Sequence, residues 1–183
     1  MKAPPLVERA LALAAERGFA HSCSREVGAL LHVLAARRGV LRAAEIGTGC
    51  GVGAAWIVSA LPPGVRFFTA EIDPDRAAAV RRDLFASDPD VSVLTGDWRE
   101  TLTTEAPFDF LFVDAAKQRP DLDGAAVLGL LTPGATVVLD DLTPGWAEPD
   151  PVRDFWLGHR DLVATELRTS PERAVIVAVK VKP

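Results

Sequence analysis

Residues 45–53 read Glu-Ile-Gly-Thr-Gly-Cys-Gly-Val-Gly and follow a short apolar run of strand length. A helix is expected directly after them, from about Ala54 to Leu61. Glycine allows positive φ and a close approach of the backbone to a ligand, so this loop suits a binding site. Taken alone the loop is ambiguous. Gly49-x-Gly51-x-x-Ala54 also fits a dinucleotide site, and a tight turn that binds nothing has the same glycines.

Between residues 41 and 141, short apolar runs alternate with Ala-, Leu- and Arg-rich stretches of helix length. The runs are LRAAEI (41–46), RFFTAEI (66–72), VSVL (91–94), FDFLFVD (108–114) and ATVVLD (135–140). This alternation predicts βαβ units around a parallel sheet with helices on both faces. Two more strand-like runs, 161–169 and 173–181, are separated by a few polar residues and predict an antiparallel hairpin. The expected fold is α/β: a doubly wound, Rossmann-like, mostly parallel seven-stranded sheet that ends in an antiparallel β-hairpin.

Two helices are expected before the glycine loop. Residues 5–17 have apolar side chains at helical spacing, and Gly18 closes that run. A second helix is expected to begin near Ser24, which is a good N-cap, and to stop at Gly39. These two helices form an N-terminal helical segment over residues 1–39.

The composition narrows the class of protein. The 183 residues include 20 Lys and Arg against 25 Asp and Glu, a net charge of −5, and the clustered basic face of a nucleic-acid binder is missing. Cys23 and Cys50 are too few for a disulfide framework. The N-terminal run is interrupted by charges, and no apolar run approaches the length of a membrane span. We expect one cytoplasmic domain over residues 1–183, with no nucleic-acid or membrane partner; whether it forms a homodimer is left open.

Acidic residues end the expected strands. They are Glu45, Glu71, Asp97, Asp114, Asp140 and Asp141. In a sheet of this class the carboxyl ends of the strands form the ligand crevice, and no Lys or Arg lies between Ala43 and Val65 to balance these acids. A cleft of one charge selects ligands of the other. A cationic ligand such as S-adenosylmethionine is therefore favoured over a dinucleotide, although Glu71 also stands where an NAD-binding acid is expected.

The ordered motifs resemble those of the class I S-adenosylmethionine-dependent methyltransferases. They are E-x-G-x-G-x-G at 45–51, TAEID at 69–73, GDW at 96–98, FLFVDAAK at 110–117, VVLDD at 137–141 and the terminal hairpin. The resemblance implies a cofactor site made of Glu45, Gly47, Thr48, Gly49, Gly51, Glu71, Ile72, Gly96, Asp97, Trp98 and Asp114. It implies that Glu71 binds the ribose hydroxyls and Asp97 the adenine amino group. Three alternatives stay open: Glu71 caps the helix near Pro74, Asp97 forms an Asx turn, and Trp98 only packs.

Within that family, D-A-A-K at 114–117 and the acidic pair at 140–141 resemble the metal-dependent O-methyltransferases of the catechol and caffeoyl-CoA type. This implies Asp114, Asp140 and Asp141 as ligands of Mg²⁺, with Lys117 as the base and Asp114 beside it in catalysis. Position 141 is Asp where that group has Asn. In the alternative interpretation Asp141 caps a turn and Lys117 is a solvated lysine.

The expected function is O-methylation of a small-molecule hydroxyl. The N-terminal segment, the 142–150 loop with Trp146, and Trp156 are expected to form the acceptor pocket. His21, His32 and His159 are alternative bases, of which His32 falls inside an apolar helical run and is expected to be structural. An S-adenosylmethionine-binding module without catalysis and an NAD(P)-dependent oxidoreductase remain as alternative functions.

Overall fold

The computed structural model describes residues 2–115, 122–146 and 148–182, and within them seven strands form one sheet. The strands are β1 (Arg42–Ile46), β2 (Arg66–Glu71), β3 (Val91–Thr95), β4 (Phe108–Val113), β5 (Leu131–Leu142), β6 (Leu162–Arg168) and β7 (Ala174–Lys180). Their order is β3-β2-β1-β4-β5-β7-β6, with β7 antiparallel to both of its neighbours and the other pairs parallel. This confirms the mostly parallel, seven-stranded sheet with a terminal hairpin.

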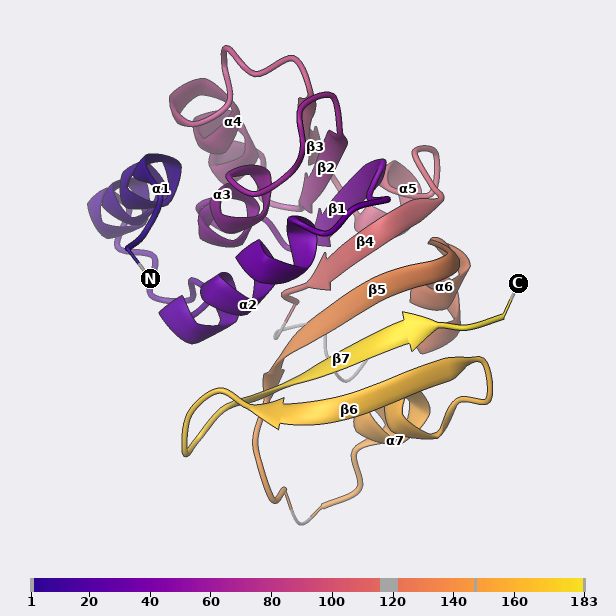
Figure 1. The fold of residues 1–183 in the computed structure, drawn as a ribbon. Coiled ribbons are helices and arrows are strands. Elements are labelled where there is room, and N and C mark those ends of the chain that lie inside the picture. Colours follow the sequence, from indigo (N-terminus) through magenta and orange to yellow (C-terminus); the bar gives the residue numbers. More distant parts are fainter. Residues whose placement is uncertain (1, 116–121, 147, 183) are drawn as a thin grey trace.

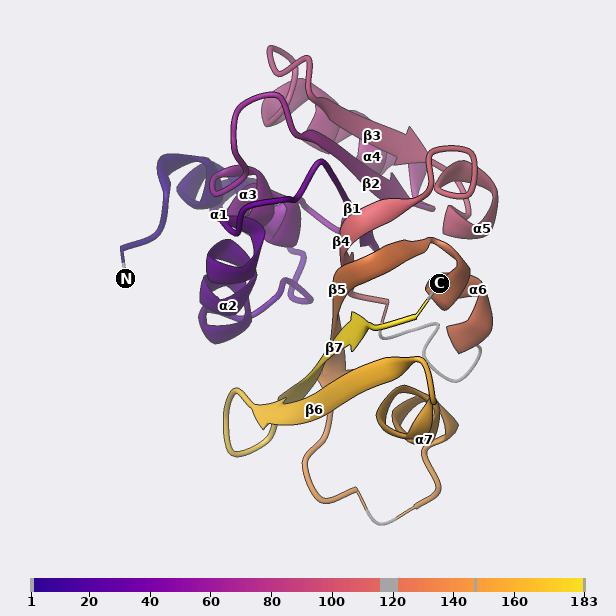
Figure 2. The same ribbon diagram turned by 45° about the vertical axis from the view of Figure 1, so that its right-hand side comes forward.

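Helices cover both faces of this sheet (Figures 1 and 2). They are α1 (Pro5–Glu16), α2 (Arg25–Ala35), α3 (Val52–Val58), α4 (Pro74–Asp83), α5 (Trp98–Thr101), α6 (Gly124–Gly129) and α7 (Pro151–Gly158). The first four lie on one face and the last three on the other (Figure 2). No helix in the described ranges is long and apolar enough to cross a membrane.

Each sheet face has its own core, because successive side chains of a strand point to opposite faces. Phe67 and Phe112 belong to the core under α1–α4. The residues next to them along the same strands, Phe68 and Leu111, belong to the core under α5–α7. All four are buried. These strands are therefore mostly apolar between their ends, as expected for strands covered on both faces, and the exceptions are Thr69 in β2 and Asp109 in β4.

Polar N-cap residues stabilise the first turns of α2 and α4. The Ser24 hydroxyl accepts a hydrogen bond from the Val27 N–H at 3.2 Å, as expected for the N-cap of α2. Asp73 caps α4 by accepting from the N–H groups of Asp75 and Arg76, both at 3.0 Å. Asp73 therefore fills the capping role considered for Glu71.

The strand order reverses between β1 and β4, since β2 follows β1 on one side and β5 follows β4 on the other. In open sheets of this type, the crevice outside the carboxyl ends of the strands at this switch point is where ligands bind. Here those ends are Ile46 and Val113. The glycine-rich loop leaves β1 at this point.

Candidate active site

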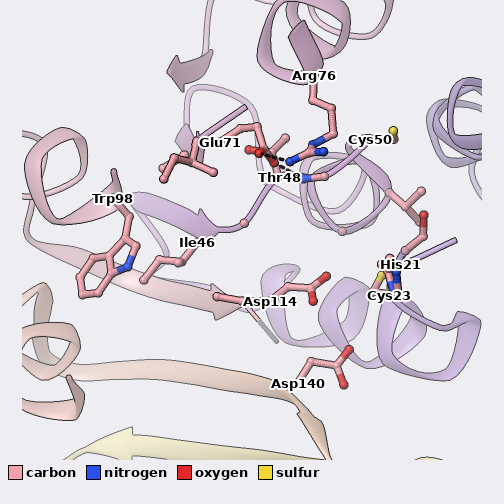
Figure 3. A pocket seen from close by; sticks show the side chains of 18 of the residues that line it. His21, Cys23, Ile46, Thr48, Cys50, Glu71, Arg76, Trp98, Asp114 and Asp140 are labelled. Atoms are coloured by element: carbon pink, nitrogen blue, oxygen red, sulfur yellow. Dashed lines mark hydrogen bonds and ion pairs between the residues drawn. The ribbon is translucent and has the colours of Figure 1, made fainter. Parts of the chain in front are cut away.

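A pocket of about 340 Å³ opens at this edge of the sheet (Figure 3). Its walls come from the glycine loop, the ends of β2, β4 and β5, the turn before α5, and the linker between α1 and α2. The predicted residues that line it are Gly47, Thr48, Gly49, Glu71, Ile72, Gly96, Asp97, Trp98, Asp114, Asp140 and Asp141. The topology thus brings together residues that lie almost 100 positions apart in the chain.

The glycine loop approaches the end of β4 so closely at Gly47 that no side chain fits there. Gly47 has φ of 90°, and a Cβ there would clash with the backbone carbonyl oxygen of Asp114. Its N–H donates to the Ala70 carbonyl at 3.0 Å, which holds the loop against β2 as well. Gly47 is therefore required both for its conformation and for the close approach.

Glu71 lies in the pocket wall with its carboxylate fixed by three donors. Oε2 accepts from the Gly49 N–H at 2.8 Å, and Oε1 accepts from the Asp73 N–H and from Nη2 of Arg76, both at 2.9 Å. Its side chain is only 5% exposed. The carboxylate that ends β2 is thus attached directly to the glycine loop after β1.

Glu45, which the sequence also placed in the cofactor site, lies behind the glycine loop and does not line the pocket. It is 1% exposed, and the Thr69 hydroxyl donates to its Oε2 at 2.6 Å. Burial, with a smaller contribution from the Glu71 carboxylate, raises the pKa of Glu45 to about 8, against the hydrogen bond from Thr69. Gly51 does not line the pocket either. Ile46, the next residue of β1, does line the pocket, as expected where adjacent strand residues face opposite ways.

Asp97 and Trp98 form the wall after β3. Asp97 is the N-cap of α5, and its Oδ1 accepts from the Arg99 N–H at 2.8 Å. It therefore has the Asx-type geometry considered as an alternative, and it lines the pocket in addition. Trp98 is buried in the same core cluster as Ile46, and it also lines the pocket.

Three aspartates meet at the opposite end of the pocket (Figure 3 labels two of them). Asp141 has φ of 65°, where the pairing of β5 with β7 shifts, and its N–H donates to Oδ1 of Asp140 at 2.8 Å. Burial and the neighbouring carboxylates of Asp141 and Asp140 raise the pKa of Asp114. Burial also raises the pKa of Asp140, to about 6. In the described part of the chain, no three His, Cys, Asp or Glu side chains are grouped as ligands of one metal ion.

The predicted base, Lys117, lies outside the described residues. Of the three histidines considered as alternatives, His21 lines the pocket. His32 bonds through Nδ1 to the Trp56 carbonyl at 3.0 Å, in agreement with a structural role, and His159 accepts from the Asp161 N–H at 3.3 Å.

The linker between α1 and α2 forms one wall of the pocket. It lies within the N-terminal segment expected on the acceptor side, although the sequence did not single out Phe19, Ser22 or Cys23. Phe19, His21, Ser22 and Cys23 line the pocket, although this stretch has no regular secondary structure. Trp156, which was expected in the acceptor wall, does not line the pocket, because it is fully buried in the core under α7. Local patterns predicted where this linker begins and ends, but they contain no signal for the surface over which it runs.

The comparisons with known proteins agree with this geometry. The family model described as a methyltransferase domain matches residues 44–142. A putative O-methyltransferase of Mycobacterium bovis is 31% identical over 131 residues, which is 68% of this chain. A catechol O-methyltransferase of Niastella koreensis is 32% identical over 136 residues, or 70% of this chain. These alignments cover 58% and 62% of the relatives' own lengths, so the chain spans about three fifths of the curated relatives.

Solved structures are similar over nearly the whole chain. The O-methyltransferase TomG from Streptomyces achromogenes, in complex with S-adenosylmethionine, superimposes with a TM-score of 0.82 at 28% identity and covers 99% of this chain and 92% of its own. An O-methyltransferase from Bacillus cereus, in complex with S-adenosylhomocysteine, has a TM-score of 0.83 at 25% identity and covers 98% and 93%. The family expected from the ordered motifs is therefore confirmed, and the chain belongs to the methyltransferase-domain family.

Proposed function

We propose that this protein transfers a methyl group from S-adenosylmethionine to a hydroxyl of a small molecule. The observation that carries the proposal is the Glu71 carboxylate, which is bonded to the glycine loop in the wall of the pocket. A buried carboxylate at the end of β2 suits a ribose hydroxyl, and the glycines of the loop allow the methionine part to approach the backbone closely. The similarity to TomG, which was solved with S-adenosylmethionine, supports the same cofactor here.

The cofactor would lie across the pocket from the β3 side to the β4 side. Ile72 and Trp98 offer apolar surfaces for the adenine ring, with Asp97 near its amino group. The sulfonium would then face the end of the pocket lined by Asp114, where carboxylates favour a positive charge. The acceptor would enter beside the linker residues His21 and Cys23.

Methyl transfer requires an acceptor oxygen in line with the methyl group and a path for its proton. Positioning of this kind can supply roughly 7–11 kcal/mol of the barrier. The pocket walls supply the positioning, whereas we assign proton removal to Lys117 and name Asp114 as the second catalytic residue. Replacing Lys117 by Met, assayed with and without Mg²⁺, tests that assignment: a base role requires a large fall in kcat at little change in cofactor affinity.

Mg²⁺ would be held by Asp114, Asp140 and Asp141. Their donor chemistry fits the ion, because Mg²⁺ prefers oxygen ligands and keeps several waters. Burial, and after it repulsion from the Asp141 and Asp140 carboxylates, raises the pKa of Asp114, and a bound cation would relieve that repulsion. When bound, the ion would lower the pKa of a coordinated acceptor hydroxyl. In the described part of the structure, the three carboxylates are not grouped as ligands of one ion.

Separate calorimetric titrations with S-adenosylhomocysteine, NAD and Mg²⁺ test the proposal most directly. S-adenosylhomocysteine is expected to bind at micromolar concentration, with NAD at least an order of magnitude weaker, because the acidic pocket opposes a diphosphate. Tighter binding of NAD would contradict the proposal. Turnover with a panel of small phenols then separates an enzyme from a module that only binds the cofactor.

A further inference from the structure

Arg76 connects the Glu71 carboxylate to the linker between α1 and α2. Its Nη2 donates to Oε1 of Glu71 at 2.9 Å, and its Nη1 lies 3.1 Å from Oδ2 of Asp73 (Figure 3 shows the pair with Glu71). The centre of the guanidinium lies 5.5 Å from the centroid of the Phe19 ring. One side chain therefore touches both the acid of β2 and the first aromatic residue of the linker.

Phe19 in turn lies against the glycine loop. A Cβ added to Gly49 would come within 2.9 Å of Cε1 of Phe19, so the ring occupies the space that the missing side chain leaves. The residues that follow Phe19 form the pocket wall beside the aspartates. Among them, the buried Oγ of Ser22 has no hydrogen-bond partner in the described part of the chain, so it is available to a bound ligand.

This wall is an irregular segment, so its position depends on a few side-chain contacts. Phe19 is joined to α1 by its N–H, which donates to the Ala14 carbonyl at 2.9 Å, and the Ser24 carbonyl accepts from the Gly28 N–H of α2 at 2.8 Å. Residues 20–23 between them belong to no helix or strand. The stacking of Arg76 on Phe19 is one of these contacts, and a guanidinium placed over an aromatic face is attracted to it. The orientation of Arg76 is set from the other side by Glu71 and Asp73, through charged hydrogen bonds.

The Glu71 carboxylate can bind a ribose hydroxyl without losing Arg76. Oε1 accepts two hydrogen bonds, whereas Oε2 accepts one, from the Gly49 N–H. A carboxylate offers about four acceptor positions, so one remains, on Oε2. A ribose hydroxyl bound at this position and the Arg76 guanidinium would then share the Glu71 carboxylate.

We propose that Arg76 is a positioning residue that couples ribose binding at Glu71 to the placement of the linker wall at residues 19–23. This inference rests on the proposed function, because the ribose belongs to the cofactor. Its consequence is an order of events: a bound cofactor adds a fourth hydrogen bond to the Glu71 carboxylate that orients Arg76, Arg76 holds Phe19, and the acceptor side of the pocket is completed.

The test combines S-adenosylhomocysteine affinity, measured by calorimetry, with hydrogen exchange of the amides at 19–23. In the unaltered protein, the ligand is expected to slow exchange in this segment. Arg76→Met keeps the aliphatic packing but removes the charge, so it should weaken binding about tenfold and abolish the slowing at saturating ligand. Arg76→Lys keeps the charge and should restore part of the affinity. Arg82→Met is the matched control on α4, since Arg82 is 67% exposed and pairs with Asp83; it should match the unaltered protein in both measurements.

Phe19→Leu removes the aromatic partner of Arg76, and it replaces the first test if the Arg76→Met protein does not fold. It should abolish the ligand-dependent slowing while affinity falls less than about threefold, because Glu71 and Arg76 are retained. The coupling is overturned if Arg76→Met binds as tightly as the unaltered protein, or tighter, since tighter binding would make Arg76 a competitor of the ribose. It is also overturned if slowing persists in either variant. Failure of the unaltered protein to bind S-adenosylhomocysteine would instead overturn the proposed function itself.

Discussion

The Thr69 hydroxyl donates a hydrogen bond to Oε2 of Glu45 across 2.6 Å, and neither residue lines the pocket. The hydroxyl oxygens of Thr48 and Thr69 lie 2.5 Å apart. Since Thr69 gives its single proton to Glu45, Thr48 must be the donor in that second contact. The chain of three side chains ties the glycine loop to β2 and β1 from behind, so Glu45 supports the loop.

Glu45→Gln should change how the stability of the protein depends on pH. The pKa of Glu45 is raised to about 8 in the folded protein from 4.5, so folding favours its protonated form. The contribution of this preference to the free energy of unfolding is complete below about pH 4.5. It is lost as pH rises through about 8, at up to ~1.4 kcal/mol per pH unit. Glutamine stays neutral. The free energy of unfolding of the variant, relative to the unaltered protein, should therefore rise between about pH 4.5 and 8 and level off above.

Urea unfolding of both proteins across this pH range measures that difference. Contributions from the other buried acids, Asp114 and Asp140, cancel between the two proteins. A difference that does not vary with pH would show that Glu45 is ionised in the folded protein.

Gly47→Ala should destabilise the protein more than Gly64→Ala. Both glycines have positive φ, 90° and 81°, so an alanine is strained at either position, by about 1–2 kcal/mol. Gly64 has open space around it, whereas a Cβ at Gly47 would clash with the Asp114 carbonyl oxygen. The clash should add roughly 1–3 kcal/mol at Gly47. Equal losses of unfolding free energy in urea would mean that the glycine loop can move away from β4.

Glu71→Gln should weaken S-adenosylhomocysteine binding by roughly 10- to 100-fold, corresponding to the loss of charged hydrogen bonds worth about 1.5–3 kcal/mol. Glutamine preserves the shape but removes the charge that faces Arg76 and the ribose. Glu105→Gln is the matched control, because Glu105 pairs with Arg42 at the surface and does not line the pocket. Calorimetry should show unchanged affinity in the control. Equal affinities in all three proteins would remove Glu71 from the cofactor site.

Much of the fold could be predicted because its signals are local. Gly18 and Ser24 marked the end of one helix and the start of the next, and both have the expected roles in the structure. The first residues of β5 were missed, since Pro133 and Gly134 read as a turn. In the structure, Gly134 has φ of 84°, and the register between β4 and β5 shifts beside it. A bulge of this kind depends on the neighbouring strand, which the local pattern does not contain.

The residues of the candidate site also fall into those that the sequence could predict and those that it could not. Residues at strand ends, such as Glu71 and Asp114, were predictable because parallel strands bring their carboxyl ends to one edge. The linker residue Phe19 was not, because its place over Gly49 results from how α1 and α2 pack on α3. Arg76 also gave no signal, since an arginine in the first turn of a helix is usually solvated.

Mg²⁺ binding, if the three aspartates hold the ion, should strengthen with pH around the pKa of Asp140. That pKa is raised to about 6, mainly by burial, and a carboxylate must lose its proton before it ligates a metal. Asp140 is therefore mostly protonated at pH 5 and mostly ionised at pH 7, so the affinity for Mg²⁺ should rise about tenfold between these pH values. The rise is larger if Asp114, whose pKa is also raised, must lose a proton as well before the ion binds. Asp140→Asn should bind Mg²⁺ more weakly at pH 7 and lose this part of the pH dependence. Asp161→Asn is a suitable control, because Asp161 lies in the turn before β6 and does not line the pocket. Titrations with MgCl₂ at both pH values measure these affinities directly; binding that is equal at the two pH values, or unchanged in Asp140→Asn, would place the ion elsewhere and leave proton removal to the side chains of the pocket.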